Sequence, residues 1–405
     1  MPAMKRLRLH FSVFTIGFIL LVDLIGELYR FHGYLLLDLL LPLVCAAWLV
    51  KNLLERRPIH WPRTLPFAAF FCLFGLSSLL IHAGDMGAGN LLGAAFYGVR
   101  WASAYFLCVI VQSQSDWERG WTEKLLFGFS LLLCLAGFAQ LDIMPDFTAM
   151  EALGWDPHQN RLLSTWFDPN FVGGFLAFVL PMIIGTALDR PKERVWLVPL
   201  AAVVTLALAL TLSRSAYLAM LAGLFVFGLL RSVKLLAAGG ILLVLMTAVL
   251  PPVQSRFFTL VDNIESVFVD NYTLPDASAR LRFASWSEAW QLFQEDPILG
   301  QGYNRYKYAA LELGTLKDLN IHSASGSDSS LLNILATTGI LGFLPFFTVY
   351  IFLAQQAWRQ RKDGYSAGFF AALCGLFIHS IFVNSLLFPL FMAPFWISAG
   401  LLRRE

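Results

Sequence analysis

The chain consists mainly of long apolar stretches that are separated by short polar connections. A helix that crosses a membrane needs about 20 mostly apolar residues, and stretches of this kind follow one another along the sequence. The pattern predicts twelve spanning helices, which cover residues 10–28, 33–50, 65–82, 91–112, 121–141, 169–188, 194–212, 214–231, 234–252, 329–356, 365–383 and 385–402. The last two have almost no connection between them, so eleven spans and one re-entrant segment are the alternative. Both interpretations predict an all-α polytopic membrane protein.

One long polar segment interrupts this pattern at residues 252–328. It separates the first nine predicted spans, in residues 1–251, from the last three, in residues 329–405. We expect this segment to form a large, partly helical loop outside the membrane, which closes over a site at the membrane surface.

A helix is predicted inside this loop by aromatic residues at spacings of three and four, which is typical of one helix face. These residues are Phe283, Trp286, Trp290 and Phe293. Asp276 or Ser278 can cap the helix, so Arg280 and Arg282 are expected in its first turn. Backbone N–H groups at a helix start, together with guanidinium groups, favour binding of an anion.

The basic residues predict the orientation of the spans. Short cytoplasmic connections are enriched in Lys and Arg, and most of the 29 basic residues fall in alternate predicted connections. Both chain ends belong to this basic set. We therefore expect both termini in the cytoplasm, and residues 252–328 on the outer side of the membrane.

The composition argues against other classes of protein. Hydrophobic residues make up 58% of the chain and charged residues 14%, whereas a soluble domain carries about a quarter charged residues. A net charge of +2 without a long basic run gives no sign of a nucleic-acid partner. The five cysteines lie in apolar stretches without metal-ligand spacing, so we expect free, buried thiols and no disulfide framework.

Two polar residues stand out inside the predicted spans. Arg100 lies within the fourth span, where a charged side chain is usually paired or functional. Its possible acidic partners are Asp23, Glu27 and Asp38. A ligand-binding role is the alternative to pairing. His379 lies in the eleventh span, where a polar group is expected to form a hydrogen bond between helices.

Several arginines fall at the predicted outer boundary of the membrane, against the usual bias. The candidates are Arg161, Arg214, Arg280 and Arg282. Because guanidinium pairs with phosphate oxygens in a forked geometry, such a group suits a diphosphate. The other interpretation is that these side chains reach toward lipid head groups. No Asp-x-Asp pair suggests a metal on this side, so we expect no metal and no cofactor. The arginines would then stabilise a leaving diphosphate.

The candidate catalytic residues are His322 and Asp328, which lie just before the tenth predicted span. Each of them can act as a general base toward a sugar hydroxyl. The alternative for each is a polar loop residue that is only solvated.

A resemblance to a known family rests on a set of short motifs in a fixed order. The motifs are Arg161 with Asp168-Pro169-Asn170, Ser213-Arg214-Ser215, Arg282-x-x-x-Trp286, Pro297-x-x-Gly300-x-Gly302, a loop His or Asp, and the run from Leu331 to Gly342. Together they resemble the O-antigen ligase and O-antigen polymerase superfamily. The resemblance covers residues 155–345 approximately, and the number of spans and the large outer loop agree with it.

This resemblance implies a glycosyltransferase of the C-type group that works without metal at the outer face of the inner membrane. Its donor would be a glycan on undecaprenyl diphosphate, and its acceptor a glycan or glycolipid. The diphosphate-binding arginines of the family correspond to Arg161, Arg214 and Arg282, with Arg280 beside them. The position of the family's catalytic His is held by Asp328, and His322 lies six residues earlier, so the base stays open between the two.

The function predicted from the sequence is therefore transfer of a glycan from undecaprenyl diphosphate to an acceptor sugar hydroxyl with inversion. The acceptor is lipid A–core for a ligase or another lipid-linked repeat for a polymerase. The alternative function is a transporter or flippase for a lipid-linked or anionic solute. Transporters often carry an internal repeat, and this sequence shows none. A non-catalytic scaffold is a third possibility, and it would need no cluster of outer arginines.

Overall fold

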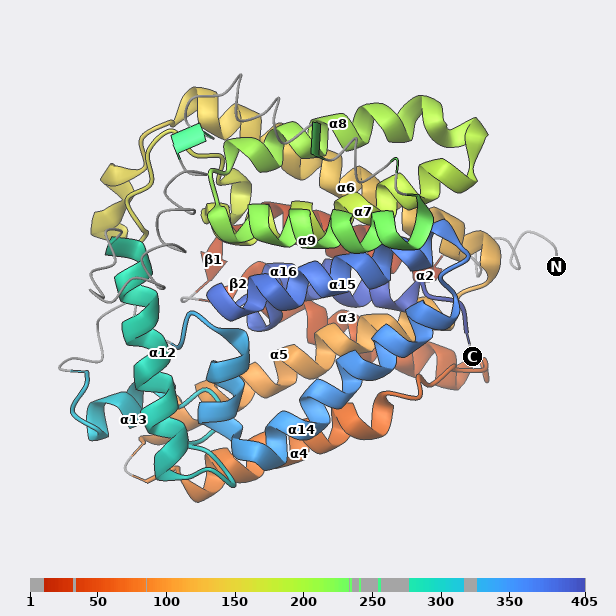
Figure 1. The fold of residues 1–405 in the computed structure, drawn as a ribbon. Coiled ribbons are helices and arrows are strands. Elements are labelled where there is room, and N and C mark those ends of the chain that lie inside the picture. The colour runs from red at the N-terminus through yellow and green to blue at the C-terminus, as the bar shows by residue number, and fades with distance from the viewer. Residues whose placement is uncertain are drawn as a thin grey trace.

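The computed structural model is a bundle of long helices that run side by side (Figure 1). It describes residues 11–31, 34–84, 86–232, 234, 240–241, 254–255, 277–316 and 326–404. The helices are α2 (Phe11–Ile25), α3 (Leu36–Leu54), α4 (Leu65–Ile81), α5 (Ala88–Gln112), α6 (Asp116–Ile143), α7 (Pro169–Asp189), α8 (Arg194–Leu210), α9 (Arg214–Arg231), α12 (Ala277–Glu295), α13 (Tyr306–Glu312), α14 (Ser330–Arg359), α15 (Gly364–Phe382) and α16 (Pro389–Gly400).

Short elements connect some of these helices. The 3₁₀ helices are η1 (Gly26–Leu28), η2 (Thr148–Leu153), η3 (Ser164–Trp166), η4 (Pro191–Glu193) and η6 (Ser385–Leu387). Two strands of two residues each, β1 (Arg30–Phe31) and β2 (Tyr34–Leu35), pair antiparallel with Arg30 opposite Leu35.

The prediction of an all-α polytopic membrane protein is confirmed. Within the described residues, nine helices are long and apolar enough to cross a membrane, and each coincides with a predicted span. The predicted third span is α4, which is apolar but has only 17 residues. The predicted ninth span, residues 234–252, lies almost entirely outside the described residues. Of the predicted loop 252–328, residues 254–255, 277–316 and 326–328 are described, and the proposed division of the chain at its ends stays a prediction.

The twelfth predicted span corresponds to α16, which is too short to cross a membrane unaided. Its 12 residues extend about 18 Å at the usual rise of a helix. Every residue from Leu390 to Gly400 is buried. The side chain of Trp396 packs between Trp101 of α5 and Tyr350 of α14. The apolar character of this stretch therefore reflects burial inside the protein rather than contact with lipid.

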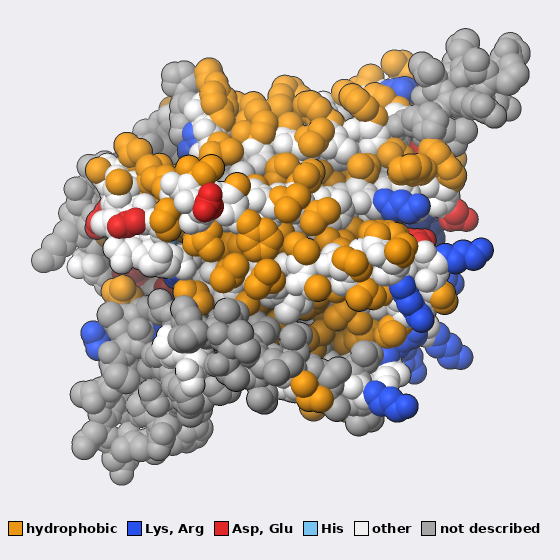
Figure 2. Space-filling model, turned by 90° about the horizontal axis from the view of Figure 1, so that it is seen from above, with side chains coloured by type: hydrophobic (Ala, Val, Ile, Leu, Met, Phe, Trp, Pro, Cys, Tyr) orange, Lys and Arg blue, Asp and Glu red, His pale blue; other side chains and the backbone are white. Residues whose placement is uncertain are grey.

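The two ends of the bundle differ in charge. We call the end that carries Arg119, Arg190, Arg231, Lys362 and Arg403 the basic end, and the opposite end, where α7 and α9 begin, the α12 end. Figure 2 shows Lys and Arg side chains gathered at one end of the molecule, while hydrophobic side chains cover its middle. This separation agrees with the expected alternation of basic connections, and the orientation of the chain in a membrane stays a prediction.

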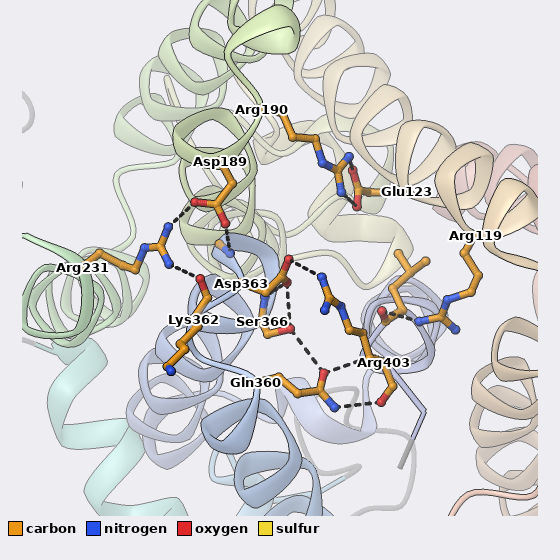
Figure 3. A network of polar contacts seen from close by, with 12 residues as sticks. Arg119, Glu123, Asp189, Arg190, Arg231, Gln360, Lys362, Asp363, Ser366 and Arg403 are labelled. Atoms are coloured by element: carbon orange, nitrogen blue, oxygen red, sulfur yellow. Dashed lines mark hydrogen bonds and ion pairs between the residues drawn. The ribbon is translucent and has the colours of Figure 1, made fainter.

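Ion pairs and hydrogen bonds hold the basic end together (Figure 3). Arg190 of α7 binds Glu123 of α6 through two contacts of 2.5 and 3.0 Å. Arg119 donates hydrogen bonds to the carbonyls at the end of α16, including 2.9 Å to Gly400. These carbonyls have no partner within their own helix, so Arg119 fixes the end of α16.

Arg100 is paired within the bundle. Its guanidinium lies 2.5 Å from the carboxylate of Asp38 in α3, and both side chains are buried. Arg100 also lies over the ring of Tyr97 at 4.0 Å. Of the two predicted roles, the structure therefore shows the pairing. All five cysteines are free, as predicted, although Cys72 and Cys374 are only half-buried.

Helix α14 is broken at Gly339, and a turn from another part of the chain fills the break. Gly339 has φ 57° and ψ −166°, which interrupts the helix. The carbonyl of Pro297 accepts a hydrogen bond from the Ile340 amide at 2.9 Å, and the Gln301 amide donates to the Ala336 carbonyl at 2.8 Å. The chain after α12 thus satisfies backbone groups that the broken helix leaves open.

Glycine is required on both sides of this contact. A Cβ on Gly300 would clash with the backbone of Thr338 and Gly339, and a Cβ on Gly339 would clash with the carbonyl of Ile298. Both glycines also have positive φ, which side chains other than glycine rarely adopt. Ser78 of α4 adds a hydrogen bond of 3.1 Å to the Thr337 carbonyl.

Helix α12 lies across the ends of the bundle helices (Figure 1). Its described residues run from Ala277 to Glu295 and include Arg280 and Arg282. The residues before Ala277 lie outside the described part of the chain, so the first-turn position of the two arginines stays a prediction. Asp276 lies outside the described residues, as does the side chain of Ser278. The buried face of α12 carries Ala289 and Leu292, which pack against α13 and α14.

The predicted aromatic face of α12 is not its buried face. Phe283 and Trp290 keep 43% and 47% of their surface exposed. Trp286 contacts Phe382 of α15, with ring centroids 5.6 Å apart. Half-exposed aromatic side chains at the end of a bundle suit the boundary between lipid and water.

We predict that Gly339→Ala destabilises the protein because it adds about 1–3 kcal/mol of backbone strain and displaces the docked turn. The measurement is thermal unfolding of the purified protein in detergent. Gly128→Ala is the matched control, since a Cβ at Gly128 in α6 meets nothing within 4 Å. An unchanged melting temperature for Gly339→Ala would contradict the role given to the break.

Candidate functional site

The segment that leads into α7 forms one wall of the α12 end. It folds back on itself, since the Phe147 amide donates to the His158 carbonyl at 2.8 Å and the Asn160 amide to the Pro145 carbonyl at 2.8 Å. Trp155 lies under the guanidinium of Arg30 at 5.4 Å. These contacts place the polar residues from Asp156 onward beside the start of α7.

Asp168 begins α7 as its N-cap. Its carboxylate accepts hydrogen bonds from the amides of Asn170 at 2.6 Å and Phe171 at 3.4 Å. Pro169 follows as the first helical residue, where its missing N–H costs nothing. The start of the predicted span 169–188 is therefore confirmed.

Arg161 holds the tight turn between α8 and α9. Its Nε donates to the carbonyl of Thr211 at 2.8 Å, and its Nη2 lies 3.5 Å from the carbonyl of Leu212. Leu212 has φ 51°, a strained conformation for a branched side chain. Because the guanidinium binds the two carbonyls beside this strained residue, Arg161 stabilises the turn.

Arg214 is the first residue of α9 and follows this turn directly. Ser213 donates to the amide oxygen of Asn170 at 2.8 Å and lies 3.1 Å from the hydroxyl of Ser215. Arg161 also reaches the Asn170 oxygen, at 3.5 Å. Arg161 and Arg214 are therefore brought to the same turn, beside the starts of α7 and α9.

Arg282 adds a third arginine from α12. Burial raises the pKa of Asp168, and the hydrogen bond from Asn170 and the positive charges of Arg161 and Arg282 offset part of this rise. Both arginines therefore act on one carboxylate, although they come from segments about 120 residues apart in the sequence. Arg280 lies on the same helix and is exposed.

Asp328 lies at the start of α14, next to α12. Its amide donates to the hydroxyl of Ser285 at 3.0 Å, so the helix that carries Arg282 also positions Asp328. Burial raises the pKa of Asp328, the charge of Arg282 lowers it, and Asp168 and Asp156 raise it further. The side chain keeps contact with solvent, which limits the effect of burial. The other candidate base, His322, lies outside the described residues.

His379 lies beneath this cluster and was not predicted as part of it. It is fully buried in α15, and its Nδ1 lies 2.7 Å from the hydroxyl of Ser385 in η6. The predicted hydrogen bond between helical elements is therefore confirmed. Its ring packs on Gly174 of α7, where a Cβ would come within 2.5 Å of Cε1. The charge of Arg282 also acts on this ring.

One group of residues has the geometry of a metal site. The possible ligand atoms of Asp156, His158 and Asp168 all lie within 4.8 Å of one another, the only such group in the described ranges. The sequence argument looked for an Asp-x-Asp pair and missed this combination. His158 also lies 3.4 Å from Arg161 through Nδ1, and Asp168 accepts the two amides at the start of α7. The His158 and Asp168 side chains of this group therefore already have protein partners.

Electrostatically, this end of the protein suits a ligand with several negative charges. Arg161, Arg214 and Arg282 lie among the starts of α7 and α9, whose backbone N–H groups add positive potential. The carboxylates of Asp168 and Asp328 lie next to the arginines. An anion held by guanidinium groups beside a carboxylate of raised pKa is an arrangement suited to proton transfer next to a charged leaving group.

The fold and this cluster define a polytopic membrane protein with a basic site at one end of its bundle. Residues 199–347, from α8 into α14, match the family model described as O-Antigen ligase (Wzy_C). This match places the stretch in the O-antigen ligase and polymerase superfamily and supports glycan transfer of that general type. The stretch includes Arg214, Arg282 and Asp328, while Arg161 lies before it. A comparison with curated proteins finds no match.

We predict that Arg161→Ala lowers the stability of the protein, because the turn between α8 and α9 loses a charged donor to two carbonyls. The expected loss is about 1–3 kcal/mol, measured as a lower melting temperature in detergent. Arg280→Ala removes the same charge from an exposed position and serves as the control. Equal stability of the two variants would show that Arg161 does not hold the turn.

Proposed function

We propose that the chain is a metal-independent, inverting glycosyltransferase of the O-antigen ligase or polymerase type. It takes a glycan from undecaprenyl diphosphate and transfers it to a sugar hydroxyl of a glycan or glycolipid acceptor. The α12 end faces the periplasm in this proposal, and the basic end faces the cytoplasm. The observation that carries the proposal is that Arg161, Arg214 and Arg282, from three separate segments, lie at the α12 end. Two of them, Arg214 and Arg282, belong to the stretch that matches the family model.

The arginines would bind the diphosphate. The Nη contacts of Arg161 are long, at 3.4 and 3.5 Å, which is the weak limit of hydrogen bonding. Phosphate oxygens can replace them while Nε keeps its bond to Thr211. Arg214 and Arg282 supply two further forked donors. The half-exposed aromatic side chains of α12 suit the polyprenyl chain where it leaves the membrane.

The reaction would then proceed in one displacement. The base removes the proton of the acceptor hydroxyl, whose oxygen attacks the anomeric carbon. The bond between that carbon and the phosphate oxygen breaks, and the diphosphate leaves with its additional negative charge. The arginines stabilise this charge as it develops, and attack opposite to the leaving group inverts the anomeric centre.

Asp328 is the base that we propose from the described residues. The raised pKa of its carboxyl makes it a stronger base than an ordinary aspartate. Ser285 fixes its backbone one helical turn away from Arg282. The base therefore lies close to the group that would bind the leaving diphosphate. His322 is the alternative base, and a ligase and a polymerase would differ only in the acceptor.

We predict that Arg214→Ala and Arg282→Ala each lower the transfer rate about 100- to 1,000-fold, the usual cost of one donor to a developing charge. The assay uses purified protein and labelled lipid-linked glycan, in EDTA. Lys307→Ala, which removes a positive charge from α13 at the same end, is the control. Activity that needs added metal would contradict the arginine mechanism and favour an ion at Asp156, His158 and Asp168.

We also predict that Asp328→Asn lowers the rate at least about 100-fold and leaves lipid-linked donor binding intact. In the wild type, the rate should fall as the pH drops through the raised pKa of Asp328, because only the carboxylate accepts the proton. His322→Gln is made in parallel. Loss of activity in His322→Gln, with an unchanged pH profile in Asp328→Asn, would assign the base to His322 instead.

A further inference from the structure

A second charged site lies at the basic end, away from the cluster described above. A pocket with a volume of about 590 Å³ opens there between the ends of α7 and α9 and the connection from α14 to α15. Leu188 and Leu230 form its apolar side. Ser232 and four cationic residues line the rest, and the cationic residues are Arg231, Lys234, Arg361 and Lys362. Among the described residues, none with an acidic side chain lines it.

The pocket wall is held in place by Arg231. Its guanidinium binds the carboxylate of Asp189 at the end of α7 and donates to the carbonyl of Lys362 at 2.5 Å. Asp189 in turn accepts the amide of Gly364 at 2.5 Å. Figure 3 shows Arg231 pointing between these two acceptors, with the side chain of Lys362 turned away from Asp189. The pocket is therefore built on a fixed set of contacts.

The charges at the pocket do not balance within the described residues. Asp189 offsets only one of the four cations, and the side chains of Lys234 and Lys362 are exposed. Arg361 lies over the ring of Trp358 at 4.4 Å, and that ring keeps 43% of its surface exposed. A half-exposed Trp beside basic side chains is typical of the level of lipid head groups.

Exposed apolar side chains lie on the pocket wall and on α8 and α9. Leu188 on the wall is 37% exposed, Leu229 on α9 is 62% exposed, and Val195 on α8 is 80% exposed. A soluble phosphate would use only the cationic side of such a pocket. A phospholipid can place its phosphate among the cations and its acyl chains along the apolar helices.

We propose that this pocket binds the head group of an anionic phospholipid, with the phosphate held by Lys234, Arg361 and Lys362. Basic pockets at the ends of spanning helices attract anionic head groups. The lipid would neutralise the cations that Asp189 leaves unbalanced and fix α9 to the start of α15. This inference does not depend on the glycan transfer proposed above, since the pocket shares no residue with that site.

The test is native mass spectrometry of the full chain in detergent with added phosphatidylglycerol, phosphatidylcholine or inorganic phosphate. We expect the wild type to retain phosphatidylglycerol over phosphatidylcholine. Lys234→Ala with Lys362→Ala should weaken this binding on the order of tenfold, because each basic residue near the surface contributes to attraction of anionic lipid. The double variant lacks no contact that holds Arg231 in place.

The matched control is Lys124→Ala with Lys192→Ala, which removes the same charge from two exposed positions at the same end, outside the pocket. Equal loss of lipid in both double variants would show a general charge effect and overturn the proposal. Binding of inorganic phosphate as strong as that of phosphatidylglycerol would show a site for a soluble anion and would also overturn it. Melting temperatures verify that both double variants are folded.

Discussion

The arrangement of the α12 end depends on one requirement, that the backbone groups of a broken membrane helix find partners inside the protein. Lipid offers no hydrogen bonds, and α14 is interrupted at Gly339. The turn from Pro297 to Gly302 supplies the missing partners. Because this turn directly follows α12, filling the break also fixes where α12 lies. Arg282 and Ser285 reach Asp328 only because of this connection.

The site contains carboxylates next to its arginines and is not a group of arginines alone. Arg161 binds the α8–α9 turn, and its charge and that of Arg282 both act on Asp168. The charge of Arg282 also acts on Asp328. Arg161 and Arg282 are thus each near a carboxylate, which lowers the repulsion between these two guanidinium groups when no anion is bound. A diphosphate would exchange these contacts for stronger ones, so binding and structural roles overlap at the same residues.

Much of the fold could be predicted from the sequence, because the length of an apolar stretch is dictated by the thickness of a bilayer. The same rule failed for α16, since a helix buried by protein is as apolar as one that faces lipid. The sequence identified the motif residues, but it did not show which structural role each of them has. Gly300 and Gly339 must be glycines because their backbones are in direct contact, and this contact could not be predicted from the sequence.

Side-chain neighbours across distant segments were the hardest to predict. The sequence placed His379 in a span but gave no sign that it lies near the arginines. Its ring packs on Gly174 of α7, where the charge of Arg282 acts on it. Asp156, His158 and Asp168 have no recognised spacing, and they meet because the preceding loop folds back on itself.

The burial of α16 constrains the order in which the bundle can form. This helix packs against α2, α3, α5 and α6, and Arg119 of α6 binds the carbonyls at its end. All of these partners are synthesised before it. The earlier helices therefore cannot complete their contacts with α16 until this late, short segment has been synthesised. Assembly of the protein is thus necessarily completed after insertion, and a ribosome stalled before residue 389 would leave a bundle without its middle.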